Sequence, residues 1–307
     1  MMRLVFMGTP EWAIPPLEGL LESGHELTGV LTQPDRYAGR NRILAASPVK
    51  QKALKRGLQV FTPEKGDSPE TFEVLKEMNP DLILVCAYGQ ILPQDLIDLP
   101  RRGCFNLHFS LLPRWRGASP VQAAIFAGDR ETGVSLQRMV LRLDAGPVVA
   151  ESVAEPIRPD DTGVTLGARS SRLGGILVRE TLPGLLEGSC SEIPQDESRA
   201  TRCRLIRKED GRAVWQEEDA LTLERKLRAY TPWPGLFCFD LGGKRLQIIR
   251  TEVVESNLEP GLVGEGLVIG TKRGGLKVLR LREEGKKELD AGVFLSGRSK
   301  LPGTRLN

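Results

Sequence analysis

Residues 3–31 read RLVFMGTPEWAIPPLEGLLESGHELTGVL, and this stretch decides the class of fold. A short apolar run, Leu4 to Met7, is followed by a helical stretch from Glu11 to Glu22 and then by a second apolar run, Leu27 to Leu31. Two strands joined by a helix form the βαβ unit from which parallel sheets are built. The sequence therefore predicts an α/β fold.

The same alternation of predicted strands and helices continues to about Glu187. Further strands are predicted at 59–61, 82–86 and 104–108, and helices at 48–56, 70–78 and 120–126. The run Leu82-Ile83-Leu84-Val85-Cys86 has no polar alternation, as expected for a central strand covered by helices on both faces. We therefore predict that residues 1–188 form a Rossmann-like domain with a mostly parallel sheet, and that ligands bind at the carboxyl ends of its strands.

The residue pattern of the sequence changes after Gly188. Residues 189–206 are polar and aperiodic, which is typical of an extended linker. Beyond it, a helix at Leu221–Ala229 precedes short segments at 237–241, 245–249, 266–269 and 276–281 that alternate with glycine turns. This pattern predicts that residues 207–307 form an OB-like β-barrel domain.

Composition limits the classes of protein to consider. A chain of 307 residues is long enough for two domains, and its 43 Lys plus Arg against 40 Asp plus Glu do not by themselves require nucleic acid. The five cysteines are odd in number and form no Cys-x-x-Cys pair, which argues against a disulfide framework and a zinc site. No apolar run approaches the roughly 18 residues of a membrane span. We expect a cytoplasmic monomer that uses neither membrane nor metal.

Three polar residues are candidates for chemistry. Asn106 and His108 lie two apart at the end of a predicted strand, so their side chains should share one face, and only two histidines occur in the chain. Asp144, in Leu143-Asp144-Ala145-Gly146, supplies a carboxylate. The amide suits oxyanion stabilisation, the imidazole proton transfer, and the carboxylate orientation of the imidazole. A core histidine and a turn aspartate remain the structural alternative.

The surroundings of these residues favour direct transfer of an acyl-type group without a covalent enzyme intermediate. Ser110 is the only candidate nucleophile nearby, and it lacks the Gly-x-Ser-x-Gly elbow. Gly8-Thr9-Pro10 follows the first strand where a dinucleotide enzyme carries Gly-x-Gly-x-x-Gly, so we exclude a nicotinamide or flavin cofactor.

A long segment from Gln33 to Val49 has neither helical nor strand period and contains Arg36, Arg40 and Arg42. Long irregular loops in compact domains are often functional, and three arginines can pair with several phosphates. Binding of a polyanion is one reading of this loop, and a solvated basic surface is the other.

The motif Asn106 to Pro120, together with Gly128 to Val134 and Leu143 to Gly146, resembles the folate-dependent formyltransferase superfamily. Further segments resemble its branch that formylates methionine on initiator tRNA, and the likeness spans essentially the whole chain. These segments are Phe6 to Pro10, Thr32 to Arg36, Ala38 to Arg40, Ser47 to Lys50, Ala87 to Gly89, Lys208 to Gly211 and Pro232 to Gly235.

The resemblance implies a reaction and a role for each site residue. The α-amino group of methionyl initiator tRNA attacks the formyl carbon of 10-formyltetrahydrofolate through a tetrahedral intermediate. It implies that Asn106, His108 and Asp144 are catalytic, that Ser110, Leu111, Leu112 and Pro113 border the folate, and that Pro113 fixes its peptide, in a cis or trans state. It assigns Arg36, Arg40 and Arg42 to the acceptor end of the tRNA and the barrel to the acceptor arm.

Two segments depart from the pattern of that branch. Arg40-Asn41-Arg42-Ile43 stands where a glycine and lysines are usual, and Val140 and Arg142 lie in a stretch that leans toward enzymes formylating an amino sugar on a nucleotide. Against that rival stand Gly8-Thr9-Pro10 and the loop from Gln33 to Arg42. A glycinamide-ribonucleotide enzyme would end near the linker. A non-catalytic RNA-binding protein is the alternative from another class.

Overall fold

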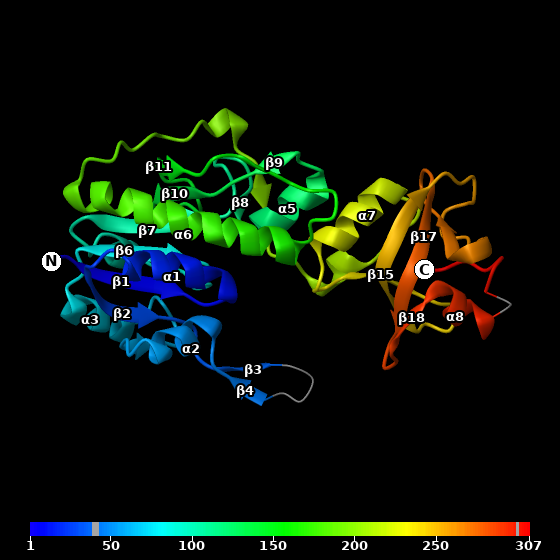
Figure 1. Cartoon of the computed structure of the whole chain (residues 1–307), viewed down its shortest axis with the longest axis horizontal. Helices are drawn as coiled ribbons and strands as arrows, with labels where there is room; N and C mark the ends of the chain where they lie inside the picture. The colour runs from blue at the N-terminus through cyan, green and yellow to red at the C-terminus, as the bar shows by residue number, and fades with distance from the viewer. Residues whose placement is uncertain (39–42, 299–300) are drawn as a thin grey trace. The chain divides into compact units, whose positions relative to one another are not determined.

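The computed structural model of the protein describes residues 1–38, 43–298 and 301–307 (Figure 1). The chain forms two compact units, each of which draws on separate stretches of sequence. The first comprises Met1–Pro120, Glu131–Pro156 and Gly167–Cys203, and the second comprises Val121–Arg130, Ile157–Leu166 and Arg204–Asn307. The predicted division at residues 188 and 206 differs from this in detail and stays a prediction.

The first unit is built on a seven-stranded sheet with the order β11-β10-β7-β6-β1-β2-β5. Its strands are β1 (Arg3–Gly8), β2 (Glu26–Leu31), β5 (Val60–Phe61), β6 (Leu82–Cys86), β7 (Gly103–His108), β10 (Ser135–Arg138) and β11 (Val148–Glu151). β1, β2, β5, β6 and β7 pair in parallel, whereas β10 is antiparallel to both β7 and β11. The predicted α/β fold with a mostly parallel sheet is confirmed.

Helices cover both faces of this sheet. On one face, Val5 and Met7 of β1 belong to a core that includes Leu75 and Met78 of α3 (Pro69–Met78). On the other face, α6 (Gly163–Glu187) runs beside α1 (Ile14–Leu21) (Figure 1). A Cβ at Gly19 of α1 would lie 2.6 Å from the carbonyl oxygen of Gly175 in α6, so glycine permits this close helix packing.

Shorter elements complete the first unit. They are η1 (Glu11–Ala13), α2 (Pro48–Lys55), α4 (Gln94–Ile97), β8 (Arg116–Gly117), β9 (Glu131–Thr132), β12 (Glu155–Pro156), η2 (Glu197–Arg199) and β13 (Arg202–Cys203). β8 pairs in parallel with β13, which ties the end of the unit to the segment that follows β7. α5 (Pro120–Ala127) follows β8 and lies almost entirely in the second unit.

The second unit contains a curled antiparallel sheet with the order β14-β15-β17-β16, and β18 pairs with β17. Its elements are η3 (Lys208–Gly211), α7 (Ala220–Ala229), β14 (Leu236–Phe239), β15 (Arg245–Val254), η4 (Glu265–Leu267), β16 (Val268–Gly270), β17 (Gly275–Glu283), β18 (Glu288–Asp290) and α8 (Ala291–Ser296). Leu223 and Leu227 of α7 pack into its core with Trp215. The predicted helix and four predicted strands are all present.

The segment from Gln33 to Val49 differs from the sequence-based prediction, which expected no strand there. β3 (Arg36–Ala38) and β4 (Ile43–Ala45) form an antiparallel pair in which Tyr37 lies opposite Leu44. Strands of three residues are too short to display a period, and aromatic and β-branched side chains stabilise such pairs across the strands. The connection between β3 and β4, residues 39–42, lies outside the described residues.

Among the residues that the structure describes, no helix is both long enough and apolar enough to cross a membrane. The five cysteines, Cys86, Cys104, Cys190, Cys203 and Cys238, are all free thiols.

Candidate active site

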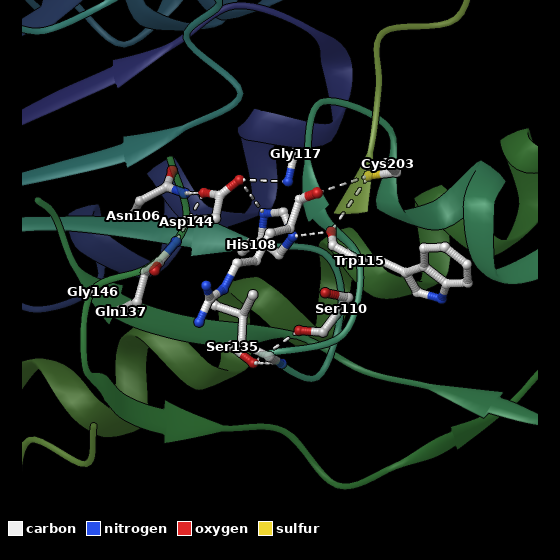
Figure 2. A network of polar contacts seen from close by, with 12 residues as sticks. Asn106, His108, Ser110, Trp115, Gly117, Ser135, Gln137, Asp144, Gly146 and Cys203 are labelled. Carbon is white, nitrogen blue, oxygen red and sulfur yellow. Dashed lines mark hydrogen bonds and ion pairs between the residues drawn. The ribbon is translucent and has the colours of Figure 1, made fainter. Parts of the chain in front are cut away.

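Asn106, His108 and Asp144 meet at the carboxyl end of β7 (Figure 2). Asn106 and His108 are alternate residues of that strand, and both side chains reach the Asp144 carboxylate. The Asn106 amide donates to Asp144 Oδ1 at 3.2 Å, and His108 Nδ1 lies 3.6 Å from Asp144 Oδ2. The structure thus brings the three predicted residues together, with the His108 and Asp144 side chains 6% and 8% exposed.

The Asp144 carboxylate is held by further donors. Gln137 Nε2 donates to Oδ1 at 2.9 Å, and the backbone N–H of Gly117 donates to Oδ2 at 2.8 Å. With the Asn106 amide, three N–H groups therefore bind one carboxylate and fix its orientation. Asp144 itself has a φ of 49°, in the left-handed region that aspartate tolerates better than most residues.

The tautomer of His108 follows from its second contact. His108 Nε2 lies 2.9 Å from the carbonyl oxygen of Trp115, which can only accept a hydrogen bond. Nε2 therefore carries the proton in the neutral ring, and Nδ1 is the basic nitrogen beside Asp144. A ring held in this way can take a proton at Nδ1, and Asp144 then stabilises the imidazolium.

The predicted folate-bordering residues follow β7 directly. The Ser110 hydroxyl donates to the carbonyl of Arg114 at 2.5 Å, and the Leu112 N–H donates to Ser135 Oγ at 2.9 Å. The Leu112–Pro113 peptide is cis, one of the two states that the sequence allowed. Ser135 Oγ also lies 2.8 Å from the Ser110 carbonyl oxygen, so one hydroxyl of β10 fixes two points of this loop.

Two groups near Asn106, His108 and Asp144 are poor nucleophiles. Ser110 is 1% exposed and its hydroxyl proton is directed to the Arg114 carbonyl, not to a base. Cys203 Sγ contacts the carbonyl oxygens of Trp115 and Arg116 at 3.4 Å. Burial raises the pKa of the Cys203 thiol, and the Asp144 carboxylate raises it as well, so the thiol stays protonated at neutral pH.

The arginines that were predicted to bind RNA are far from Asn106, His108 and Asp144 in the sequence. Arg36 of β3 forms an ion pair with Glu64 at 3.5 Å, and both side chains are mostly exposed. Arg40 and Arg42 lie outside the described residues. Within the described ranges, no group of three or more His, Cys, Asp or Glu residues is arranged to hold a metal ion.

Sequence reasoning missed four residues that shape the site: Trp115, Gly117, Gln137 and Gln195. Gln137 could have been found, because Ser135 and Gln137 alternate with Val134 and Leu136 in a short strand pattern, and β10 places Gln137 directly opposite Asn106. Trp115 and Gly117 act through their backbone groups, which a side-chain pattern does not reveal. Gln195 lies in the polar stretch that resembles a linker.

The chain matches known families and relatives over nearly its full length. Residues 2–182 match the model of the formyl transferase family, and residues 205–299 match the model of the formyl transferase C-terminal domain. A methionyl-tRNA formyltransferase of Methylococcus capsulatus is 45% identical over 310 residues, covering 99% of each chain. Another from Myxococcus xanthus is 43% identical, covering 99% of this chain and 97% of the relative.

Solved structures share the fold at lower identity. HypX from Aquifex aeolicus in complex with tetrahydrofolic acid gives a TM-score of 0.61 at 20% identity, over 98% of this chain and 48% of HypX. An N-formyltransferase from Helicobacter canadensis in complex with folinic acid and dTDP-3-aminofucose gives a TM-score of 0.66 at 16% identity, over 90% and 98% of the two chains. At these identities the likeness is one of fold.

Proposed function

Because the chain belongs to the formyl transferase family, we propose that it transfers the formyl group of 10-formyltetrahydrofolate to the α-amino group of methionyl initiator tRNA. The observation that carries this acceptor is the likeness to methionyl-tRNA formyltransferases, which extends over 99% of the chain and so includes the second unit. The product is N-formylmethionyl-tRNA, which serves translation initiation in the cytoplasm, and the enzyme acts as a monomer.

Asn106, His108 and Asp144 have separate roles in a direct transfer. The attacking amine must be neutral, and His108 Nδ1 accepts the proton that it loses as the new C–N bond forms. Asp144, 3.6 Å from Nδ1, stabilises the resulting imidazolium. His108 then returns the proton to the departing folate nitrogen as the old C–N bond breaks. Proton transfer of this kind contributes about 10²–10⁴ in rate.

Asn106 supplies the oxyanion donor in this scheme. One hydrogen of its Nδ2 binds Asp144, and the second hydrogen is directed to the formyl oxygen as that oxygen becomes negative. Loss of one such donor costs about 10²–10³ in rate in other enzymes. No covalent enzyme adduct is required, since Ser110 donates elsewhere and Cys203 remains a thiol.

Two binding surfaces complete the proposal. The loop Ser110, Leu111, Leu112 and Pro113 borders the folate and holds the donor against the trio. Arg36, Arg40 and Arg42 bind the acceptor end of the tRNA. The curled sheet of the second unit belongs to an OB-like barrel, residues 207–307, that binds the acceptor arm, while residues 1–188 form the catalytic domain and 189–206 join the two.

The test mixes purified protein with 10-formyltetrahydrofolate and, in separate reactions, methionyl initiator tRNA or a nucleotide-linked amino sugar. Release of tetrahydrofolate and appearance of formylmethionyl-tRNA are expected only in the first. Formylation of the sugar alone would instead assign the protein to the enzymes that formylate an amino sugar on a nucleotide, which the stretch from Arg138 to Leu143 resembles.

A variant, His108→Ala, separates catalysis from binding. The proposal expects kcat to fall by about 10²–10⁴ while the affinity for tRNA is kept. If neither acceptor is formylated by the wild-type protein but tRNA still binds, the protein is an RNA-binding module on a transferase scaffold, and the proposal is wrong.

A further inference from the structure

Gln195 lies against the backbone of the loop that carries Asp144. Its Nε2 donates to the carbonyl oxygens of Asp144 at 2.9 Å and Gly146 at 2.6 Å, so both of its hydrogens are used. Of residues 191–199, Gln195 is the one that is not exposed. A single side chain therefore holds two points of the loop through its backbone carbonyls.

Gln195 is itself held by a buried arginine. Arg116 Nε donates to Gln195 Oε1 at 2.8 Å, which fixes the orientation of the amide and leaves its N–H groups pointing at the loop. Arg116 is 2% exposed, and its two terminal nitrogens bind the carboxylate of Glu197 at 3.1 and 2.9 Å. Both oxygens of Glu197 are thus engaged in a bidentate pair, which has a defined geometry.

The loop that Gln195 holds has little freedom to adopt another shape. Asp144 has a left-handed φ of 49°, and a Cβ at Gly146 would lie 1.8 Å from the carbonyl oxygen of Arg138. A residue in the left-handed region keeps that conformation only when its surroundings impose it. The Gln195 amide is one of the groups that impose it here, because it binds the carbonyl of Asp144 itself.

We propose that Gln195 is a positioning residue for the transfer reaction: it fixes the backbone of Asp144, and thereby the distance from Asp144 Oδ2 to His108 Nδ1, without touching either substrate. This inference rests on the proposed function. A shift of the carboxylate by a fraction of its 3.6 Å distance from His108 weakens stabilisation of the imidazolium, whereas the surfaces that bind folate and tRNA stay intact.

The test compares Gln195→Glu with Gln195→Met and a control, Gln94→Met. Glutamate keeps the size of the side chain and an acceptor for Arg116 but removes the N–H donors to the loop. Methionine removes both functions. The exposed side chain of Gln94, at the start of α4, donates to Asp98 Oδ1 just beyond the end of that helix. Each variant is assayed for kcat and for KM with both substrates.

We expect both Gln195 variants to lower kcat by about 10- to 100-fold with KM changed less than twofold, and Gln94→Met to match the wild type. A rise in KM at unchanged kcat would make Gln195 a substrate contact, and unchanged kinetics would remove it from the mechanism. Either result overturns the inference. If methionine unfolds the protein, Gln195→Glu carries the test alone.

A second readout does not depend on turnover. The chain has only two histidines, so ¹⁵N spectra of histidine-labelled protein contain one site signal and one internal reference, His25. The inference expects the ring signals of His108 to move in both Gln195 variants while those of His25 stay in place. An unmoved His108 signal overturns it even if the wild-type protein fails to formylate tRNA, so the two failures are distinguishable.

Discussion

At His108 the two ring nitrogens face different partners, and this asymmetry fixes the neutral tautomer of the ring. The Trp115 carbonyl holds the proton on Nε2, so under the proposed function Nδ1 is the nitrogen that exchanges protons beside Asp144. Asp144 in turn depends on a backbone group, the Gly117 N–H, as well as on side chains. At this scale the site is a set of single contacts, each of which a point substitution can remove.

Gly117→Ala tests the backbone contact. A Cβ at this position would lie 1.9 Å from the carbonyl oxygen of Cys203, and the residue has a φ of 118°. The N–H that binds Asp144 must therefore move, and we expect kcat to fall by about 10²-fold. Steady-state kinetics provide the measurement.

Gly57→Ala is the matched control for that substitution. Gly57 also has a positive φ, but a Cβ there would meet nothing within 4 Å. Its cost is limited to backbone strain of about 1–2 kcal/mol in the free energy of unfolding. Equal kinetic losses in the two variants would contradict the role given to Gly117.

We expect the free energy of unfolding to depend on pH through Glu197. Hydrogen bonds from Arg116 and then Arg142 lower the pKa of its carboxyl from 4.5 to about 2. A lowered pKa in the folded state means that the contribution to stability is present above pH 4.5 and is lost as the pH falls toward 2.

The comparison for that prediction is wild type against Glu197→Gln. We expect the wild-type advantage in the free energy of unfolding, measured by urea titration, to be present at about pH 6 and smaller at about pH 3. A difference that stays constant over this range would show that the charge of Glu197 contributes nothing.

At the scale of elements, β7 and β10 bring the site together. Their antiparallel register sets Gln137 opposite Asn106 and Ser135 opposite His108. β7 could be predicted from its apolar run and its alternating Asn106 and His108. β10 has four residues, and although its short alternation is visible in the sequence, its pairing with β7 is not, so its contribution to the site was not predicted.

Ser135→Ala tests the support that β10 gives to the loop after β7. The substitution leaves the Leu112 N–H without its acceptor in a buried place, which costs about 1–3 kcal/mol in the free energy of unfolding. Urea unfolding measures this cost, and under the proposed function KM for the folate rises as well. Ser296→Ala, which removes an exposed hydroxyl on α8, should stay within about 0.5 kcal/mol of the wild type. Equal effects of the two changes would refute the role of Ser135.

At the scale of the whole molecule, recognition of a large polyanion has to come from where charge is placed, because the net charge is only +3. The division into an α/β part and a second, β-rich part could be predicted from the change of pattern after Gly188. The role of residues 189–203 could not be predicted. Gln195 and Thr201 support the site only through contacts with residues about 50 to 90 positions away. A polar sequence does not reveal such partners.

Neutralising Arg40 and Arg42 together tests the charge of the loop. Under the proposed function, each phosphate contact that is lost weakens tRNA binding and lowers the slope of log affinity against log salt by about 0.7–0.9. The affinity for folate should not change. Binding titrations at several salt concentrations measure the slope.

Neutralising Arg3 and Arg179 is the control for that experiment. Arg3 is half-buried and Arg179 is exposed, and they form ion pairs with Glu26 and Glu22 in the first unit. The same charge is removed, so an equal loss of slope would mean that net charge, and not this loop, binds the RNA.

The packing of residues 192–203 on the first unit also governs how the two parts could be recombined. Thr201 accepts the N–H of Trp115 on its hydroxyl and that of Arg116 on its carbonyl, and Cys203 contacts both of their carbonyls. In a chimaera that transplants the transferase half onto a foreign recognition module, a joint placed at residue 188 would leave Asp144 without Gln195. A transplanted piece that keeps these contacts therefore has to extend to Cys203, and it also carries residues 121–130 and 157–166, which belong to the second unit.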